Sequence, residues 1–338
     1  MKKKLLSIVL TGALICTAMT PSLTAGAASP ENIQAMEDSN AESKTGEDTE
    51  TEGAGEDRSS TARTVPADSA DVNGTTYEYS VITPDGYEEN TEYSYPVVYL
   101  LPENGYDSWP ENIQDELTEI MASDQSMDMI IVLPTFDENN DFRTVLQTVT
   151  ENVDADYRTL ASPEYRAAVG VGVGGYMAYI AGLTDAETGT PQTSPSAYKI
   201  LASIRGDFVS DSNPWHETCG DVYDILSSLH DSDDSFYENY YTYMDTPVND
   251  EYANMSHSTN DLGAMFIDWA TTIPDYHEYT ARPGSYDSAF LTESLNRIMN
   301  RFTTHCLSGI ISGSVKLERA AMTAQESGTN AEYSFTIS

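Results

Sequence analysis

The apolar and polar positions of this chain change from a strand-like to a helix-like spacing several times after residue 75. Apolar residues alternate with polar ones at 77–82, which is typical of a half-buried strand. Continuous apolar runs of strand length, which suit strands covered on both faces, occur at 95–101, 129–133 and 167–173. Two further strands are predicted at 200–204 and 276–280, and helical spacing predicts helices at 113–121, 145–157, 174–183 and 291–302.

This order of elements predicts an α/β fold. Strands that alternate with helices at this spacing form a mostly parallel central sheet, because right-handed crossovers place the helices on both faces. We assign the folded domain to residues 64–302 and a C-terminal extension to 303–338. Segments 314–318 and 333–337 of the extension have strand-like patterns, compatible with a β-hairpin or with the start of a further β-domain.

The N-terminal part of the chain has two segments of different character. Residues 1–27 combine three lysines, an apolar stretch and the small residues 25–27, which predicts a cleaved secretory signal peptide. Its apolar stretch is too short to span a bilayer. Residues 28–63 hold ten acidic residues, three basic ones and no aromatic residue, which predicts a disordered acidic linker. We therefore expect an extracellular protein that is not inserted in a membrane after the leader is removed.

Charge narrows the range of partners and cofactors. The chain has 55 acidic and 16 basic residues and a net charge of -39, which argues against nucleic-acid binding and against anionic membrane surfaces. No group of histidines and cysteines has the spacing of a metal centre, so we expect neither metal nor cofactor. Cys219 and Cys306 remain outside the leader, and their spacing leaves open whether they form a disulfide or are two buried thiols.

Several blocks of sequence resemble one known family. The blocks occur in the same order and at the same spacing as in that family; they are 79–87, 95–101, 128–134, 149–159, 166–176 and 202–206. They resemble the esterase family of α/β hydrolases that includes esterase D, the feruloyl and acetyl-xylan esterases and the mycolyltransferases. The resemblance covers about residues 75–302. It implies an α/β-hydrolase fold and, as the family's chemistry, carboxylic ester hydrolysis.

The catalytic positions of the family are only partly kept. Its nucleophile turn, G-x-S-x-G, corresponds here to segment 170–174, so Gly172 takes the place of the serine. The loop that carries the family's histidine matches 282–287 and places Ser285 at the position of the base. Asp261 matches the acid and is the one retained member. We expect Gly172, Asp261 and Ser285 to cluster at the C-terminal edge of the sheet.

The oxyanion region also departs from the family, in which the strand that corresponds to 95–101 is followed by His-Gly. Here Pro102 has no N–H to donate, the Glu103 carboxylate would oppose a developing negative charge, and Val173 follows the altered nucleophile position. The family's serine, histidine and oxyanion motif are thus absent at three separate places. This predicts a catalytically inactive pseudoesterase, retained for binding or for structure. One alternative is an active carbohydrate-ester hydrolase that draws on His257 or His277 and on a serine from a lid. Another is a structural module of a surface protein.

The resemblance implies a polysaccharide or cell-wall glycan as the ligand class, by analogy alone. Tyrosines interleaved with acids and amides at 236–252 offer stacking faces and hydroxyl partners for such a ligand. The alternative is that these tyrosines pack inward over the sheet. The candidate contact residues are Tyr240, Tyr241, Tyr243 and Trp109.

Overall fold

The structure, a computed structural model, describes residues 63–123, 126–271, 276–312, 320–327 and 330–337. All of them belong to one compact unit that begins at Glu56. The signal peptide and nearly all of the predicted acidic linker therefore lie outside the described residues. Within these residues, no helix is both long enough and apolar enough to cross a bilayer.

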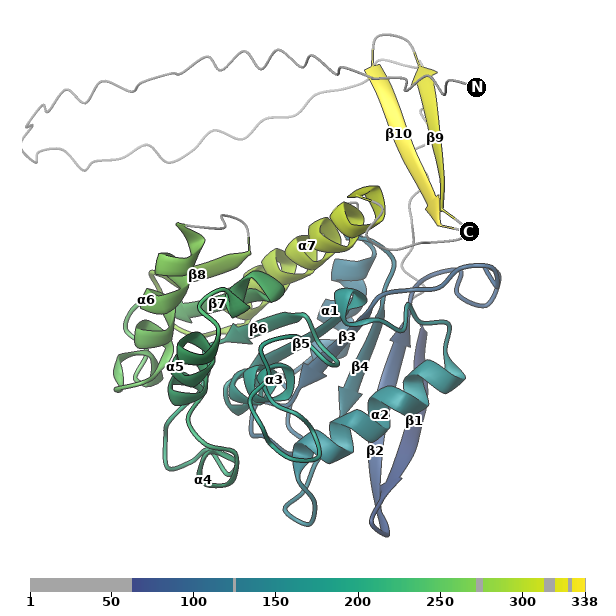
Figure 1. Cartoon of the computed structure of the whole chain (residues 1–338). Coiled ribbons are helices and arrows are strands. Elements are labelled where there is room, and N and C mark those ends of the chain that lie inside the picture. The colour runs from purple at the N-terminus through teal and green to yellow at the C-terminus, as the bar shows by residue number, and fades with distance from the viewer. Residues whose placement is uncertain (1–62, 124–125, 272–275, 313–319, 328–329, 338) are drawn as a thin grey trace, which may run out of the picture. The chain divides into compact units, whose positions relative to one another are not determined.

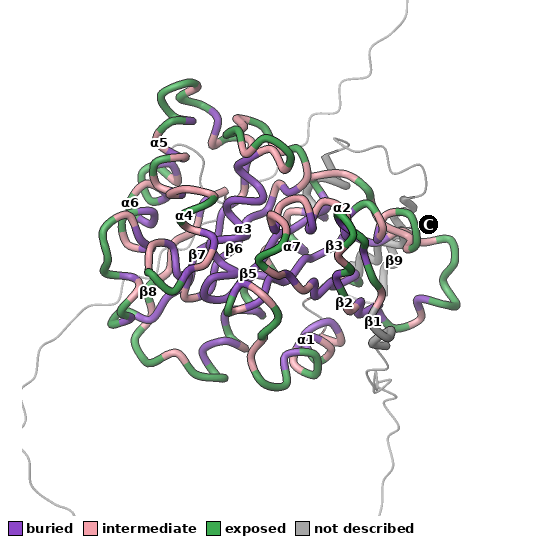
Figure 2. Tube along the Cα trace, turned by 90° about the horizontal axis from the view of Figure 1, so that it is seen from below, coloured by how far each residue is buried: buried purple, intermediate pink, exposed green. Residues whose placement is uncertain are grey.

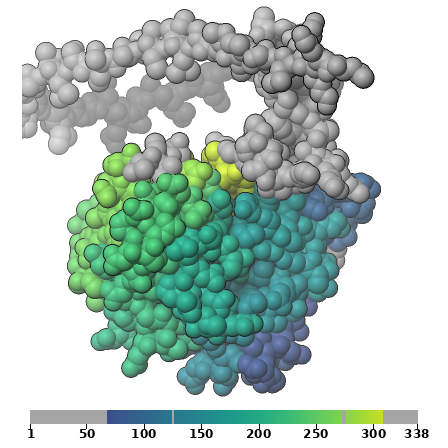
Figure 3. All heavy atoms as spheres, in the orientation of Figure 1, coloured from purple at the N-terminus to yellow at the C-terminus, as the bar shows by residue number. Residues whose placement is uncertain are grey.

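Eight strands of the described part form one sheet (Figure 1). Their spatial order is β1 (Arg63–Val72), β2 (Thr75–Thr83), β4 (Ile130–Pro134), β3 (Val97–Leu101), β5 (Arg166–Val171), β6 (Ile200–Ile204), β7 (Tyr241–Pro247) and β8 (His277–Arg282). β1 pairs with β2 as an antiparallel hairpin, β2 is also antiparallel to β4, and the remaining pairs are parallel. The early and late parts of the folded chain accordingly lie on opposite sides of the face in Figure 3.

Helices cover both faces of this sheet, because its central strands are apolar on both sides. In β3, Val97, Tyr99 and Leu101 join one core cluster, whereas Val98 and Leu100 join the other. The central strands are buried throughout (Figure 2). The first cluster packs under α2 (Phe142–Asp156), α3 (Val173–Leu183), α5 (Val222–Ser232) and α6 (Thr259–Ala270), and the second under α1 (Ile113–Met121) and α7 (Ser288–Ser312).

The predicted α/β fold with a mostly parallel sheet is confirmed, and each predicted strand and helix of the domain is present within a few residues. Sequence patterns missed β1, β7, α5 and α6. β7 is buried but polar in composition (YTYMDTP), so it lacks the apolar run of its neighbours. The shorter helices are α4 (His216–Cys219), η1 (Pro163–Tyr165), η2 (Phe236–Asn239) and η3 (Tyr252–Asn254).

The C-terminal region differs in its boundaries from the sequence prediction. α7 continues to Ser312, past the predicted domain end at residue 302. β9 (Ala320–Ser327) and β10 (Asn330–Ile337) pair as an antiparallel hairpin, whereas the predicted strand at 314–318 lies outside the described residues. Both thiols are free: Cys219 packs against the first core cluster and Cys306 belongs to the second.

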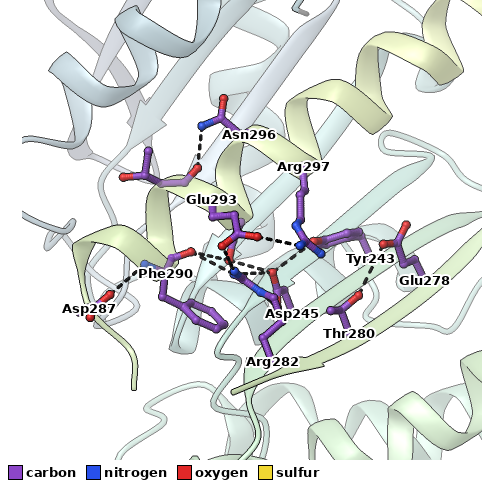
Figure 4. Close-up of polar contacts among 12 residues, drawn as sticks. Tyr243, Asp245, Glu278, Thr280, Arg282, Asp287, Phe290, Glu293, Asn296 and Arg297 are labelled. Carbon is purple, nitrogen blue, oxygen red and sulfur yellow. Dashed lines mark hydrogen bonds and ion pairs between the residues drawn. The ribbon is translucent and has the colours of Figure 1, made fainter. Parts of the chain in front are cut away.

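A buried ion pair joins β7, β8 and α7 (Figure 4). The Arg282 guanidinium donates to both carboxylate oxygens of Asp245, with Nε–Oδ1 at 2.9 Å and Nη2–Oδ2 at 2.8 Å. Asp245 is 0% exposed and also accepts a hydrogen bond from the Ser294 hydroxyl at 2.9 Å. Arg282 lies over the Phe290 ring, 3.9 Å from its centroid. This network fixes the loop between β8 and α7 at both of its ends.

We expect Arg282→Met to lower the free energy of unfolding by about 3–5 kcal/mol, because it leaves the Asp245 carboxylate buried without its partner. The matched control is Arg301→Met, which removes a partly exposed pair with Glu278 and should cost no more than about 1 kcal/mol. Urea denaturation of the three proteins gives the comparison. Equal losses in the two variants would contradict a special role for the buried pair.

Candidate functional site

The turn from β5 to α3 has the backbone geometry of a nucleophile elbow. Gly172 stands alone between the two elements, with φ 56° and ψ -122°, a combination that residues with a Cβ rarely adopt. The glycines on either side permit close packing, since a Cβ on Gly170 would lie 2.0 Å from the carbonyl carbon of Gly174. The strained backbone of a hydrolase is therefore present here without a nucleophilic side chain.

Glu103 occupies the space directly above Gly172. A Cβ added to Gly172 would lie 2.9 Å from the carbonyl oxygen of Glu103 and 3.1 Å from its Cγ. Real Cβ atoms essentially never approach other atoms to less than 3.0 Å, so a serine at this position requires the loop that carries Glu103 to move. The site therefore lacks both the hydroxyl and the room for one.

The N–H groups of the oxyanion region are already bonded within the protein. The Val173 N–H, which follows the elbow, donates to the carbonyl oxygen of Glu103 at 3.0 Å. The Glu103 N–H donates to the Ser108 carbonyl at 2.6 Å, and Pro102 has no N–H. Oxyanion stabilisation needs donors that point at the developing charge. These three residues offer none.

The loops after β7 and β8 bring a different set of side chains to the elbow than the sequence predicted. Ser285, at the histidine position, follows β8 and lines one cleft together with Glu103. Asp250 follows β7, is buried and lines the same cleft. Asp261 is exposed in the first turn of α6, where its carboxylate accepts the His257 N–H at 2.7 Å, and it is not part of the cleft lining.

Asp261 therefore does not lie with Ser285 in this cleft as the sequence predicted, and Asp250 is the aspartate that lines it. The error has a physical origin. β7 was not recognised in the sequence, so the loop after it was placed too late in the chain. The signal that identifies Asp250 is its position just after a buried strand that ends at Pro247.

The cleft is open and has a volume of about 500 Å³. Arg205 crosses it, with Nε 2.7 Å from the Asp250 carboxylate and its guanidinium against the rings of Tyr252 and Tyr286. The Tyr286 hydroxyl and the Glu103 carboxylate interact electrostatically. Burial raises the pKa of Glu103, and burial together with this carboxylate raises that of Tyr286. The lining residues are Glu103, Arg205, Pro247, Asn249, Asp250, Glu251, Gly284, Ser285 and Tyr286.

The aromatic residues proposed to contact a ligand lie mostly elsewhere. Tyr240 and Tyr243 are 1% and 4% exposed, and their hydroxyls donate to the Gln192 carbonyl and to Asp245, so both tyrosines pack inward. This corrects their assignment as a contact surface. Tyr241 begins β7 and stacks against Tyr276, and Trp109 is half-buried against the second core cluster.

The histidines considered as alternative bases do not line the cleft. His277 is buried at the first residue of β8, with Nδ1 2.8 Å from the Thr242 hydroxyl and Nε2 3.1 Å from the Tyr237 carbonyl. His277 thus lies at the N-terminal end of β8, whereas the elbow lies at the C-terminal edge of the sheet. His257 is half exposed, 3.0 Å from Asp221, and stacks on Tyr223.

Comparison with known proteins identifies the fold of the chain. No family model matches the chain, and no curated protein matches its sequence. A ferulic acid esterase of known structure superposes with a TM-score of 0.58 at 17% identity, over 72% of this chain and 98% of the esterase. The chain has the α/β-hydrolase fold.

Two further structures show the same α/β-hydrolase fold. A feruloyl esterase module from Clostridium thermocellum, complexed with sinapinate, gives a TM-score of 0.53 at 16% identity, over 72% of this chain and 89% of the module. An S-formylglutathione hydrolase from Staphylococcus aureus superposes with a TM-score of 0.51 at 14% identity, over 71% of this chain and 98% of the hydrolase. The esterase-like α/β-hydrolase fold implied by the sequence resemblance is thus confirmed, and at these identities the likeness shows the fold alone.

We expect Gly172→Ser to destabilise the protein by about 2–4 kcal/mol, because the new side chain meets Glu103 in addition to the strained backbone. The control is Gly220→Ser, which has φ 89° and no atom within 4 Å of the new Cβ, so it carries backbone strain alone. Thermal unfolding of both variants measures the difference. An equal loss in both would show that Glu103 does not obstruct the elbow.

We expect the buried His277 to make the fold sensitive to acid. Burial lowers its pKa from 6.5 to about 4. The unfolded chain therefore takes up a proton more readily between these values, and stability falls as the pH drops from 6.5 towards 4, by about 3 kcal/mol in total. Unfolding free energies across this range should fall less steeply in His277→Gln than in the wild type. His230→Gln, at an exposed helix position, is the control and should keep the wild-type slope.

Proposed function

We propose that this chain is a secreted, catalytically inactive esterase-fold protein that binds a polysaccharide in the cleft above Gly172. The observation that carries the proposal is the hydrogen bond from the Val173 N–H to the Glu103 carbonyl. It uses the N–H that would stabilise an oxyanion and holds Glu103 over the position from which a serine would attack. Secretion rests on the leader-like pattern of residues 1–27.

The side chains around the elbow support the absence of hydrolysis. Ester cleavage on this fold requires a nucleophile, a base that accepts its proton and an acid that orients the base. The corresponding positions hold Gly172, Ser285 and Asp250, and the Asp250 carboxylate is paired with Arg205. A serine hydroxyl does not accept a proton near neutral pH. A rearranged site is disfavoured because the cleft lining contains no imidazole.

The cleft itself supports a binding role. It has retained a volume of about 500 Å³, which is large enough for a sugar unit. Its lining combines the hydroxyl of Ser285, the amide of Asn249, carboxylates and the ring of Tyr286. Hydroxyl, amide and carboxylate groups exchange hydrogen bonds with sugar hydroxyls, and an aromatic ring offers a face to a pyranose. The same groups are poorly suited to an apolar ligand.

We expect the full chain to release no nitrophenol from nitrophenyl acetate or butyrate above a buffer blank, at concentrations that give rapid release with an active feruloyl esterase. Gly172→Ser/Ser285→His should also remain at the blank, because Pro102 has no N–H to donate to an oxyanion and the Glu103 carboxylate opposes a developing negative charge. Saturable hydrolysis by the wild type, abolished by one serine or histidine substitution, would contradict the proposed inactivity.

The binding half of the proposal is tested by retention on insoluble polysaccharides, with xylan, chitin and chitosan in the panel. We expect retention on at least one of them and its loss when the cleft is altered by Ser285→Trp. Retention on none would leave a spacer role in a larger surface assembly as the better account of the fold.

A further inference from the structure

The cleft above Gly172 carries an excess of negative charge. Its lining contains three carboxylates, Glu103, Asp250 and Glu251, and a single guanidinium, Arg205. With all four groups ionised, the formal charge of the cleft is -2. The chain around it is also strongly acidic, with a net charge of -39. An anionic ligand would therefore meet an unfavourable potential both on approach and in the site.

Arg205 does not reverse this sign, because its guanidinium is already occupied. Its Nε donates to Asp250 at 2.7 Å, and Nη2 lies 3.9 Å from Glu251. The faces of the guanidinium lie against two rings, 4.6 Å from the centroid of Tyr252 and 5.0 Å from that of Tyr286. A ligand carboxylate or phosphate would have to displace one of these contacts. The pairing with Asp250 leaves Glu103 and Glu251 as the carboxylates that a ligand can use.

Glu103 and Glu251 differ in their surroundings. Glu103 lies in the cleft against Gly172 and is half-buried. Loss of solvent there raises its pKa, so a cation beside it would be favourable. Glu251 lies at the rim with 78% of its side chain exposed. The cleft thus offers one partly desolvated carboxylate inside and one solvated carboxylate at the entrance.

We propose that the polysaccharide bound in this cleft carries free amino groups, as in a polymer of glucosamine, and that Glu103 receives an ammonium group of the ligand. This inference rests on the proposed function and adds the chemical class of the ligand. An ammonium offers three N–H donors and a positive charge, which suits a half-buried carboxylate. Ser285 and Asn249 remain for the sugar hydroxyls.

The test is calorimetric titration of the full chain with three soluble hexasaccharides, at a pH that keeps glucosamine amines protonated. The probes are a β-1,4-linked glucosamine hexamer, its fully N-acetylated counterpart and xylohexaose. We expect the glucosamine hexamer to bind about tenfold more tightly than the other two, as one charge-assisted hydrogen bond would provide. The preference should shrink as salt is added, since the interaction is electrostatic.

Substitutions locate the preference within the cleft. Glu103→Gln keeps the shape of the side chain without its charge and should erase the preference for the amine. Glu251→Gln should reduce the preference by a smaller factor, because its carboxylate is solvated. Glu187→Gln is the matched control, since it removes the same charge from an exposed position beyond the far end of α3 and should leave the preference intact.

The outcomes separate this inference from the proposed function. Equal affinity for the three hexamers, together with retention on an insoluble polysaccharide, would contradict the proposed preference for an amino sugar. The proposed polysaccharide-binding role would stand. No affinity for any hexamer and no retention would overturn both. A preference that persists in both Glu103→Gln and Glu251→Gln would place the amine outside this cleft. Circular dichroism shows whether Glu103→Gln folds. If it does not, the affinities of Glu251→Gln and the salt dependence decide whether the cleft carboxylates cause the preference for the amine.

Discussion

One backbone hydrogen bond, from the Val173 N–H to the Glu103 carbonyl, governs the character of this molecule's central site. It joins the first residue of α3 to the loop after β3, and it holds that loop over the bend at Gly172. A hydrolase would keep this N–H free for its reaction. Here the N–H is satisfied by a carbonyl oxygen of the protein itself.

The surrounding architecture shows why such a change is tolerated. The site lies at the edge of a sheet whose two faces are closed by separate apolar clusters. The buried pair of Asp245 and Arg282 independently ties β7 to β8 and α7. These elements pack without any contribution from catalytic side chains. Residues at the elbow can therefore be exchanged while the scaffold persists, which is consistent with function residing in sites grafted on folds.

Much of the fold was predictable because its central strands are apolar on both faces and its helices are periodic. The exceptions follow from composition. β7 contains Tyr, Thr and Asp at buried positions, so its pattern resembles a polar surface segment. That misreading placed the acid at Asp261 in place of Asp250. It also offered Tyr240 and Tyr243 as contact residues, whereas the structure shows the alternative, inward packing.

The candidate site was predictable where backbone chemistry alone decides, and not where side chains converge from distant loops. Gly172 and Pro102 are readable from sequence, since one lacks a side chain and the other lacks an N–H. The place of Ser285 in the loop before α7 followed from the family resemblance, whereas its position in one cleft with Glu103 is seen only in the structure. Arg205 contacts Asp250, Tyr252 and Tyr286, which come from other loops. Such contacts between residues far apart in the chain cannot be predicted from the pattern of a single sequence.

The position of Glu103 also determines what a side chain at the elbow would require of the main chain. Its main-chain oxygen, and not only its carboxylate, lies within 3 Å of where a Cβ on Gly172 would be. Exchanging the side chain of Glu103 leaves that oxygen in place, so no single codon change at either residue clears the bend. A side chain at position 172 therefore requires a different path of the main chain after β3, which no exchange of side chains at residue 103 supplies.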